Sequence, residues 1–177
     1  MNKWNLKQII KEEIASFMKE SSVENKKSDT LLYHGTTLNR AKKILRESEQ
    51  RSSVVFLYLA DTEEAVEQYS YRAVEDEEVE SNYEIAGEEC IIIISLAALQ
   101  KNQQSGIGEL MNDYDDIWSL YKNGQISTPP SQVSWGESLE LLGTCSYKGS
   151  LYKSIISLKL IETGEEIFPS RDKKSLQ

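Results

Sequence analysis

The chain contains very little histidine, cysteine and proline. Its 177 residues include one histidine, His34, two cysteines and three prolines. One imidazole cannot supply a His-based zinc site or a Cys₂His₂ cluster. Cys90 and Cys145 lie in strand-like runs without CxxC spacing, so they are predicted to be buried thiols in a reducing compartment. The sequence therefore predicts no metal centre.

A long hydrophobic run is also missing. The apolar run 90–94 is far too short to span a bilayer, and the first residues lack the apolar segment of a signal peptide. We therefore expect a cytoplasmic protein with no membrane partner. That cytoplasm would be a host cell's if the protein is an injected or phage-type effector.

Basic side chains are outnumbered. The chain has 20 Lys and Arg against 29 Asp and Glu, which gives a formal net charge of -9. No window concentrates Lys and Arg enough to follow a phosphate backbone. Tight non-specific binding to nucleic acid is therefore not expected.

The polarity pattern divides the chain into three parts. Residues 5–19 place apolar side chains at near-helical spacing, so residues 1–29 are predicted to be an amphipathic helix and a linker, and the helix could dock on a partner. Residues 30–165 are predicted to form one domain, and 166–177 a flexible charged tail.

Within the domain, short strands alternate irregularly with helices. Strands are predicted over 30–33, 54–59 and 89–96, with two more between 138 and 160. Helices are predicted after an N-cap at Thr37, after a capping box at Asp61, and over 109–121. The pattern indicates an α+β domain around a split or folded-over sheet.

Three short motifs carry a family resemblance. The segment Tyr33-His34-Gly35-Thr36 ends the first predicted strand, Tyr58 lies on the second, and Tyr69 follows eleven positions later on the next helix. This arrangement resembles the His-Tyr-Glu branch of the ADP-ribosyltransferase superfamily, which includes diphtheria-type toxins and poly(ADP-ribose) polymerases.

The resemblance implies a split mixed β-sheet with flanking helices, preceded here by the N-terminal amphipathic helix. It implies an enzyme that cleaves the nicotinamide–ribose bond of NAD⁺ and transfers ADP-ribose to a macromolecular acceptor, a protein rather than a nucleic acid. The expected NAD⁺-binding residues are Tyr33, His34, Gly35, Thr36, Tyr58 and Tyr69, of which His34 and Tyr58 would also be catalytic.

These residue types suit that substrate. Nicotinamide in NAD⁺ is a flat cation, and the faces of Tyr58 and Tyr69 can stack on it with cation–π attraction. A glycine at position 35 lets the backbone approach a carboxamide. His34 can hydrogen-bond a ribose hydroxyl, and Thr36 can support it.

The transition state of this transfer is cationic, so a carboxylate is needed near the ribose. In the family, a glutamate at the start of a late strand supplies it. We expect Glu140 in this role, because it opens the strand predicted to run to Tyr147, with Glu137 as the alternative. A serine that many polymerase-type members carry one turn before the second tyrosine is Val66 here, which is closer to the toxin-type pattern.

Two questions remain open at this point. Within 100–134, Asp113, Tyr114, Asp115, Asp116 and Trp118 could contact the acceptor, or Ile117, Trp118 and Tyr121 could pack inward from an ordinary helix. The alternative functions are an RNA 2′-phosphotransferase, which would want more Arg and His than this chain has, and a non-catalytic interaction module on the same scaffold.

Overall fold

The computed structural model describes residues 30–81 and 87–169. The helix and linker predicted over 1–29 lie outside the described residues, as does the tail beyond 169. The elements follow in the order β1 (Leu31–Thr37), α2 (Leu38–Glu47), β2 (Val55–Ala60), α3 (Glu64–Glu80), β3 (Glu89–Ser95), α4 (Leu96–Gln104), β4 (Gly108–Met111), α5 (Tyr114–Lys122), η1 (Pro130–Gln132), α6 (Trp135–Leu142), β5 (Thr144–Gly149), β6 (Ile155–Leu160) and β7 (Glu166–Ile167).

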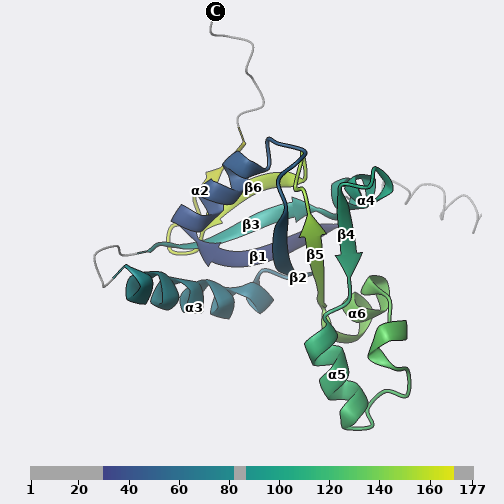
Figure 1. Ribbon diagram of the computed structural model, residues 1–177. Helices are drawn as coiled ribbons and strands as arrows, with labels where there is room; N and C mark the ends of the chain where they lie inside the picture. The colour runs from purple at the N-terminus through teal and green to yellow at the C-terminus, as the bar shows by residue number, and fades with distance from the viewer. Residues whose placement is uncertain (1–29, 82–86, 170–177) are drawn as a thin grey trace, which may run out of the picture.

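The strands form one sheet in the order β4-β5-β2-β1-β3-β6-β7 (Figure 1). Each neighbouring pair among the described strands is antiparallel. The α+β class expected from the sequence is confirmed, whereas the expected mixed pairing is wrong. Because β7 pairs with β6, the sheet extends beyond the domain boundary predicted at residue 165.

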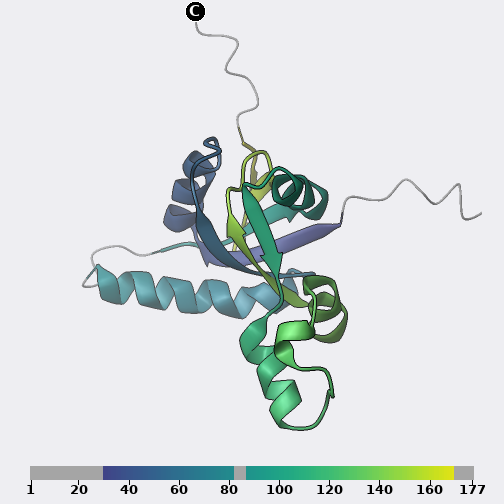
Figure 2. The ribbon, with the colours of Figure 1, turned by 45° about the vertical axis from the view of Figure 1, so that its right-hand side comes forward.

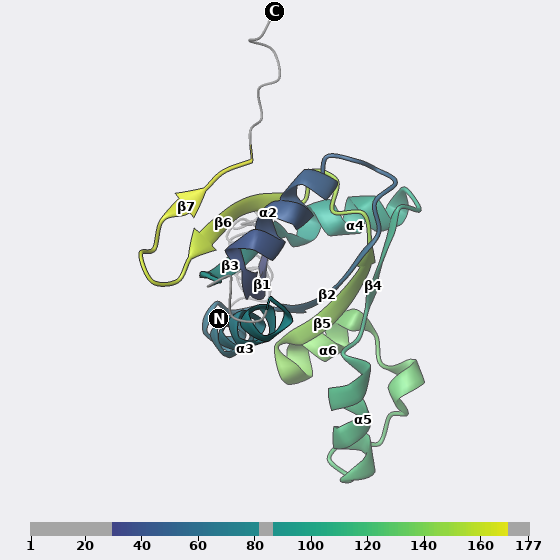
Figure 3. The ribbon, with the colours of Figure 1, turned by 60° about the vertical axis from the view of Figure 1, so that its left-hand side comes forward.

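Helices cover both faces of the sheet, which explains why β3 is apolar at successive positions. Ile92 and Ile94 join the larger hydrophobic cluster, to which α2 and α4 contribute, and Ile91 and Ile93 join a smaller cluster with Val66 of α3. Helix α3 runs along the opposite face from α2 (Figure 3). Helix packing on both sides therefore selects isoleucine at every position from 91 to 94.

The sheet has the fewest paired positions between β1 and β2, and we call this place the split. Strand β1 pairs with β3 along its whole length, from Leu31 opposite Ser95 to Thr37 opposite Glu89. With β2 its described pairing is the single position where Tyr33 faces Ala60. The two strands diverge beyond that point, and the gap between them is where the candidate site lies.

Residues 96–142 differ most from the predicted elements. The helix predicted over 109–121 is wrong in its first half, because Gly108–Met111 is strand β4 and the helix, α5, begins at Tyr114. The segment before β4, Leu96–Gln104, forms helix α4. Helices α5 and α6 project from one end of the sheet (Figure 2).

The predicted helix starts are partly correct. The Thr37 hydroxyl accepts a hydrogen bond from the Arg40 amide at 3.2 Å, so this N-cap is confirmed. The capping box predicted at Asp61 is wrong, because α3 starts at Glu64 and the nearby side-chain acceptor is Thr62, bonded by the Ala65 amide at 3.3 Å. No helix within 30–81 and 87–169 is long and apolar enough to cross a membrane.

Candidate functional site

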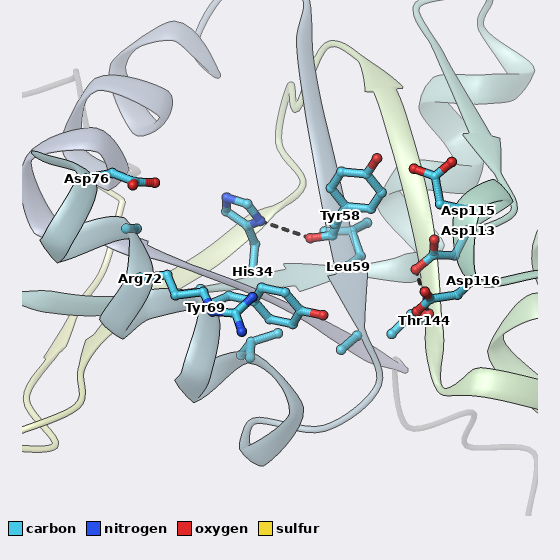
Figure 4. A pocket seen from close by; sticks show the side chains of 14 residues that line it. His34, Tyr58, Leu59, Tyr69, Arg72, Asp76, Asp113, Asp115, Asp116 and Thr144 are labelled. Carbon is cyan, nitrogen blue, oxygen red and sulfur yellow. Dashed lines mark hydrogen bonds between the residues drawn. The ribbon is translucent and has the colours of Figure 1, made fainter. Parts of the chain in front are cut away.

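A cavity of about 440 Å³ lies where β1 and β2 diverge, which is within the usual size range of small-molecule sites. Strands β1, β2 and β5, helix α3, and the start of α5 all contribute to it (Figure 4). Its lining residues are His34, Gly35, Tyr58, Leu59, Ala60, Val66, Tyr69, Arg72, Ala73, Asp76, Asp113, Asp115, Asp116 and Thr144.

The ring of His34 bridges the split in the sheet. Its Nδ1 lies 2.9 Å from the carbonyl oxygen of Tyr58. A carbonyl only accepts, so Nδ1 carries the proton and donates it, which leaves Nε2 as a bare acceptor. Burial lowers the pKa of His34, and the bond to Tyr58 opposes this effect only in part. The imidazole is therefore neutral at pH 7 and presents an acceptor to a ligand hydroxyl.

Gly35 allows α3 to lie directly against β1. A Cβ atom at this position would come within 2.2 Å of the Val66 carbonyl oxygen and 2.7 Å of the Ser70 hydroxyl. Ser70 is buried and hydrogen-bonds the carbonyl oxygens of Val66 and Cys90. The glycine thus fixes the distance between the strand that carries His34 and the helix that carries Tyr69.

Two tyrosines enter the cavity from different elements. Tyr58 comes from β2 and Tyr69 from α3, and both line the cavity (Figure 4). Their side chains are 51% and 46% exposed, so their ring faces are available to a ligand. Phe56 meets Tyr58 edge to face, with ring centroids 5.2 Å apart, and so restricts the orientation of that ring.

Carboxylates outnumber basic side chains in the cavity. Asp113, Asp115 and Asp116 stand on one side, Asp76 stands on α3, and Arg72 is the one basic side chain among the described lining residues. Burial, together with Asp113 and Asp115, raises the pKa of Asp116. With His34 neutral, the cavity attracts positive charge.

Asp113 is the most firmly held of these carboxylates. It is 7% exposed, and its Oδ2 accepts a hydrogen bond from the Thr144 hydroxyl at 2.9 Å. Its amide donates to the Ser138 hydroxyl at 3.0 Å, and that hydroxyl donates to the Thr144 carbonyl oxygen at 2.8 Å. This closed network ties the N-cap of α5 to α6 and to the first residue of β5.

Two residues of the first motif do not line the cavity. Tyr33 packs against the smaller hydrophobic cluster beside α3, and Thr36 is buried at 4% exposure. Both residues lie on β1, and neither is placed to contact a ligand in this cavity. The structure does bring together His34, Gly35, Tyr58 and Tyr69.

The two glutamates expected near the ribose lie elsewhere. The strand predicted to open at Glu140 is wrong, because Trp135–Leu142 forms α6 and β5 begins only at Thr144. Glu137 and Glu140 line a different cavity, together with 125–128, Val133 and Leu141. Glu137 caps its own helix by accepting from the Ser134 amide and hydroxyl, which lowers its pKa.

The sequence left open whether the residues around α5 face the site or pack inward, and the structure shows both. Asp113, Asp115 and Asp116 line the cavity, and Ile117 is fully buried. Trp118 and Tyr121, which an ordinary amphipathic helix would pack inward, are 47% and 37% exposed. The inward-packing interpretation is therefore correct for Ile117 alone.

Sequence reasoning missed Arg72, Asp76 and Thr144. The first two lie three and seven positions after Tyr69, so they share its face of α3, and helical spacing could have identified them. Thr144 is brought to the cavity only by the pairing of β5 with β2, for which the sequence has no local signal.

Comparison of the chain with protein-family models, with curated proteins and with solved structures gives no match. In the described part of the chain, no group of three or more His, Cys, Asp or Glu side chains is placed to hold a metal ion. Function must therefore be argued from the residues that line the cavity.

Proposed function

We propose that the protein is an NAD⁺-dependent mono-ADP-ribosyltransferase that transfers ADP-ribose to a macromolecular acceptor, preferably a protein. The observation that carries this proposal is the meeting of His34, Tyr58 and Tyr69 in one cavity at a split in the sheet. These residues are far apart along the chain, so their convergence in one cavity supports the hypothesis that they form a single site.

The tyrosines suit the nicotinamide end of NAD⁺. Tyr58 and Tyr69 offer two exposed ring faces from β2 and α3. A cationic pyridinium between them gains stacking and cation–π attraction, roughly 0.5–2 kcal/mol per ring. The nearby carboxylates strengthen the preference for a positively charged ring, and nicotinamide loses that charge when it leaves.

His34 suits the ribose. Its Nδ1 proton is committed to Tyr58, so its Nε2 can accept a hydrogen bond from a ribose hydroxyl. The reaction needs no proton from this ring, because nicotinamide departs from a pyridinium as a neutral molecule. We therefore assign His34 a binding and orienting role.

Arg72 suits the diphosphate. It lies one turn beyond Tyr69 on α3, and its guanidinium is the one cation among the described lining residues. The surplus of carboxylates disfavours an RNA 2′-phosphate, whose recognition needs several cations. An RNA 2′-phosphotransferase is for this reason the weaker candidate.

The experiment is to incubate the full chain with adenylate-labelled NAD⁺ and a cell lysate, then measure nicotinamide release and the intact masses of labelled proteins. We expect nicotinamide release together with mass increments of one ADP-ribose. A ladder of increments would contradict mono-transfer. Protein that binds NAD⁺ but neither hydrolyses nor transfers it would instead support a non-catalytic module.

Cavity variants make this experiment specific. Tyr58→Ala is expected to reduce turnover, and Tyr121→Ala, which removes an exposed tyrosine outside the cavity, is the matched control. Equal losses from both substitutions would mean that the cavity is not the site of the reaction.

A further inference from the structure

We infer that Asp113 is the catalytic carboxylate of this site, acting on the ribose in the position for which the sequence suggested Glu140. The inference rests on the proposed function and names the residue that the reaction requires there. The observations behind it are the position of Asp113, the hydrogen bonds that hold it, and the carboxylate charges near Tyr58.

The start of β5 carries no carboxylate of its own. Gly143, with φ 72°, ends α6, and β5 begins with Thr144 and Cys145. Thr144 nevertheless lines the cavity, and its hydroxyl donates to Asp113. A carboxylate therefore does reach the beginning of this late strand, but it is supplied from the N-cap of α5.

Asp113 is held in place before any ligand binds. Its side chain is anchored by Thr144, its amide by Ser138, and its carbonyl oxygen accepts from the Ile117 amide at 3.0 Å. Asp115 and Asp116, by contrast, are exposed. Electrostatic stabilisation of a transition state depends on groups that do not have to reorganise when the charge develops, and Asp113 meets that condition best.

The charge of Asp113 acts at the tyrosine that would contact nicotinamide. Burial raises the pKa of the Tyr58 hydroxyl, and Asp115, Asp113 and Asp116 raise it further. These three carboxylates are therefore close enough to Tyr58 to favour a positively charged ring bound against it. Figure 4 shows Asp113 and Thr144 on the far side of Tyr58 from His34.

The chemical step balances with this assignment. The bond between C1′ of the ribose and the pyridinium nitrogen breaks, and its electron pair goes to that nitrogen, so neutral nicotinamide leaves. The ribose becomes oxocarbenium-like, and the Asp113 carboxylate stabilises its positive charge. The acceptor nucleophile then forms the new bond to C1′ and releases its proton to solvent.

The test compares three carboxylate variants of the full chain. Asp113→Asn removes the charge and leaves an amide oxygen for the Thr144 hydroxyl. Glu140→Gln tests the competing assignment, and Glu109→Gln on β4, outside the cavity, is the matched control. The readouts are the kcat of nicotinamide release and the Kd for NAD⁺ from equilibrium binding.

We expect Asp113→Asn to lower kcat about 10²–10³-fold with little change in Kd, and both glutamine variants to behave like wild type. Near-wild-type kcat in Asp113→Asn, or a loss of that size in Glu140→Gln, would overturn the assignment while leaving the proposed function intact. Wild-type protein without nicotinamide release would overturn both.

Thr144→Val serves if Asp113→Asn does not fold. It retains the carboxylate and removes the hydroxyl that orients it. We expect a loss of about tenfold in kcat at unchanged Kd, since a misplaced group loses transition-state stabilisation without loss of ground-state binding. Unchanged kcat in a folded Thr144→Val variant would count against the inference.

Discussion

Replacing Gly35 by alanine perturbs the site through its geometry alone. The new Cβ would lie 2.2 Å from the Val66 carbonyl oxygen, whereas ordinary van der Waals contact begins at 3.4 Å. The obstructing atom belongs to the backbone of α3, so no side-chain rotation relieves the clash. The helix must move away from β1 by roughly 1 Å, and it carries Tyr69 with it.

The size of the effect follows from this displacement. Overpacking of a well-packed contact costs about 1–3 kcal/mol, which for a domain of this size lowers Tm by about 2–12 °C. A shift of about 1 Å in a ligand-positioning group can lower turnover about 10²-fold. Gly35→Ala is therefore expected to lose both stability and nicotinamide release.

The assays are thermal unfolding and nicotinamide release, with Gly136→Ala as the matched control. Gly136 lies in α6, and the nearest atom to its added Cβ is the Ser134 hydroxyl oxygen at 4.0 Å. That substitution should raise helix stability by up to about 1 kcal/mol. A Gly35→Ala variant with the Tm and turnover of the wild type would refute this account of the contact between α3 and β1.

Three further predictions use the cavity and the core. The pKa of His34 in the folded protein is lowered from 6.5, so the neutral ring contributes fully to the free energy of unfolding above about pH 6.5. This contribution declines as the pH falls from 6.5 toward the lowered folded pKa. Urea unfolding at several pH values should show the decline, and a His34→Gln variant should not. Tyr58→Ala and Tyr69→Ala should each weaken NAD⁺ binding by roughly 0.5–2 kcal/mol, while the phenylalanine variants keep most of the affinity, as calorimetry can measure. Burial raises the thiol pKa of Cys90 to about 11 and of Cys145 to about 12, so neither should react with a thiol reagent at pH 8 until the protein is unfolded.

The parts of the fold that sequence reasoning found are those with one unambiguous pattern. The Ile91–Ile94 run marks β3, and the helical spacing of apolar residues that begins at Leu38 marks α2. Tyr58 and Tyr69 lie on the strand and the helix expected for them, because an unbroken apolar run marks β2 and acidic residues mark the start of α3.

The error at Glu140 has a physical cause. Alternating Leu139, Glu140 and Leu141 is compatible with a strand, but Ser134 and Glu137 form a capping box that starts a helix upstream. Gly143 then ends that helix in a left-handed conformation. The capping signal was visible in the sequence and outweighs alternation over so short a segment.

The role we assign to Asp113 had no local signal of that kind. Its partner Thr144 is 31 residues away along the chain. The two meet because β4 and β5 are neighbours and because Ser138 of α6 hydrogen-bonds both residues. Hydrogen-bond networks that join three elements depend on tertiary packing. A sequence pattern can indicate which polar residues are candidates, but it does not show which of them bond to each other.

The split in the sheet also divides the site between two halves of the molecule. His34, Tyr69 and Arg72 belong to the half built on β1 and α3, whereas Tyr58 and Asp113 belong to the half built on β2, β5 and β4. The larger hydrophobic cluster includes residues of both halves, so they are joined continuously on that face. A relative rotation of the halves would have to repack this cluster, because it contains side chains of both. The width of the cavity on one face of the sheet is therefore set by packing on the other face.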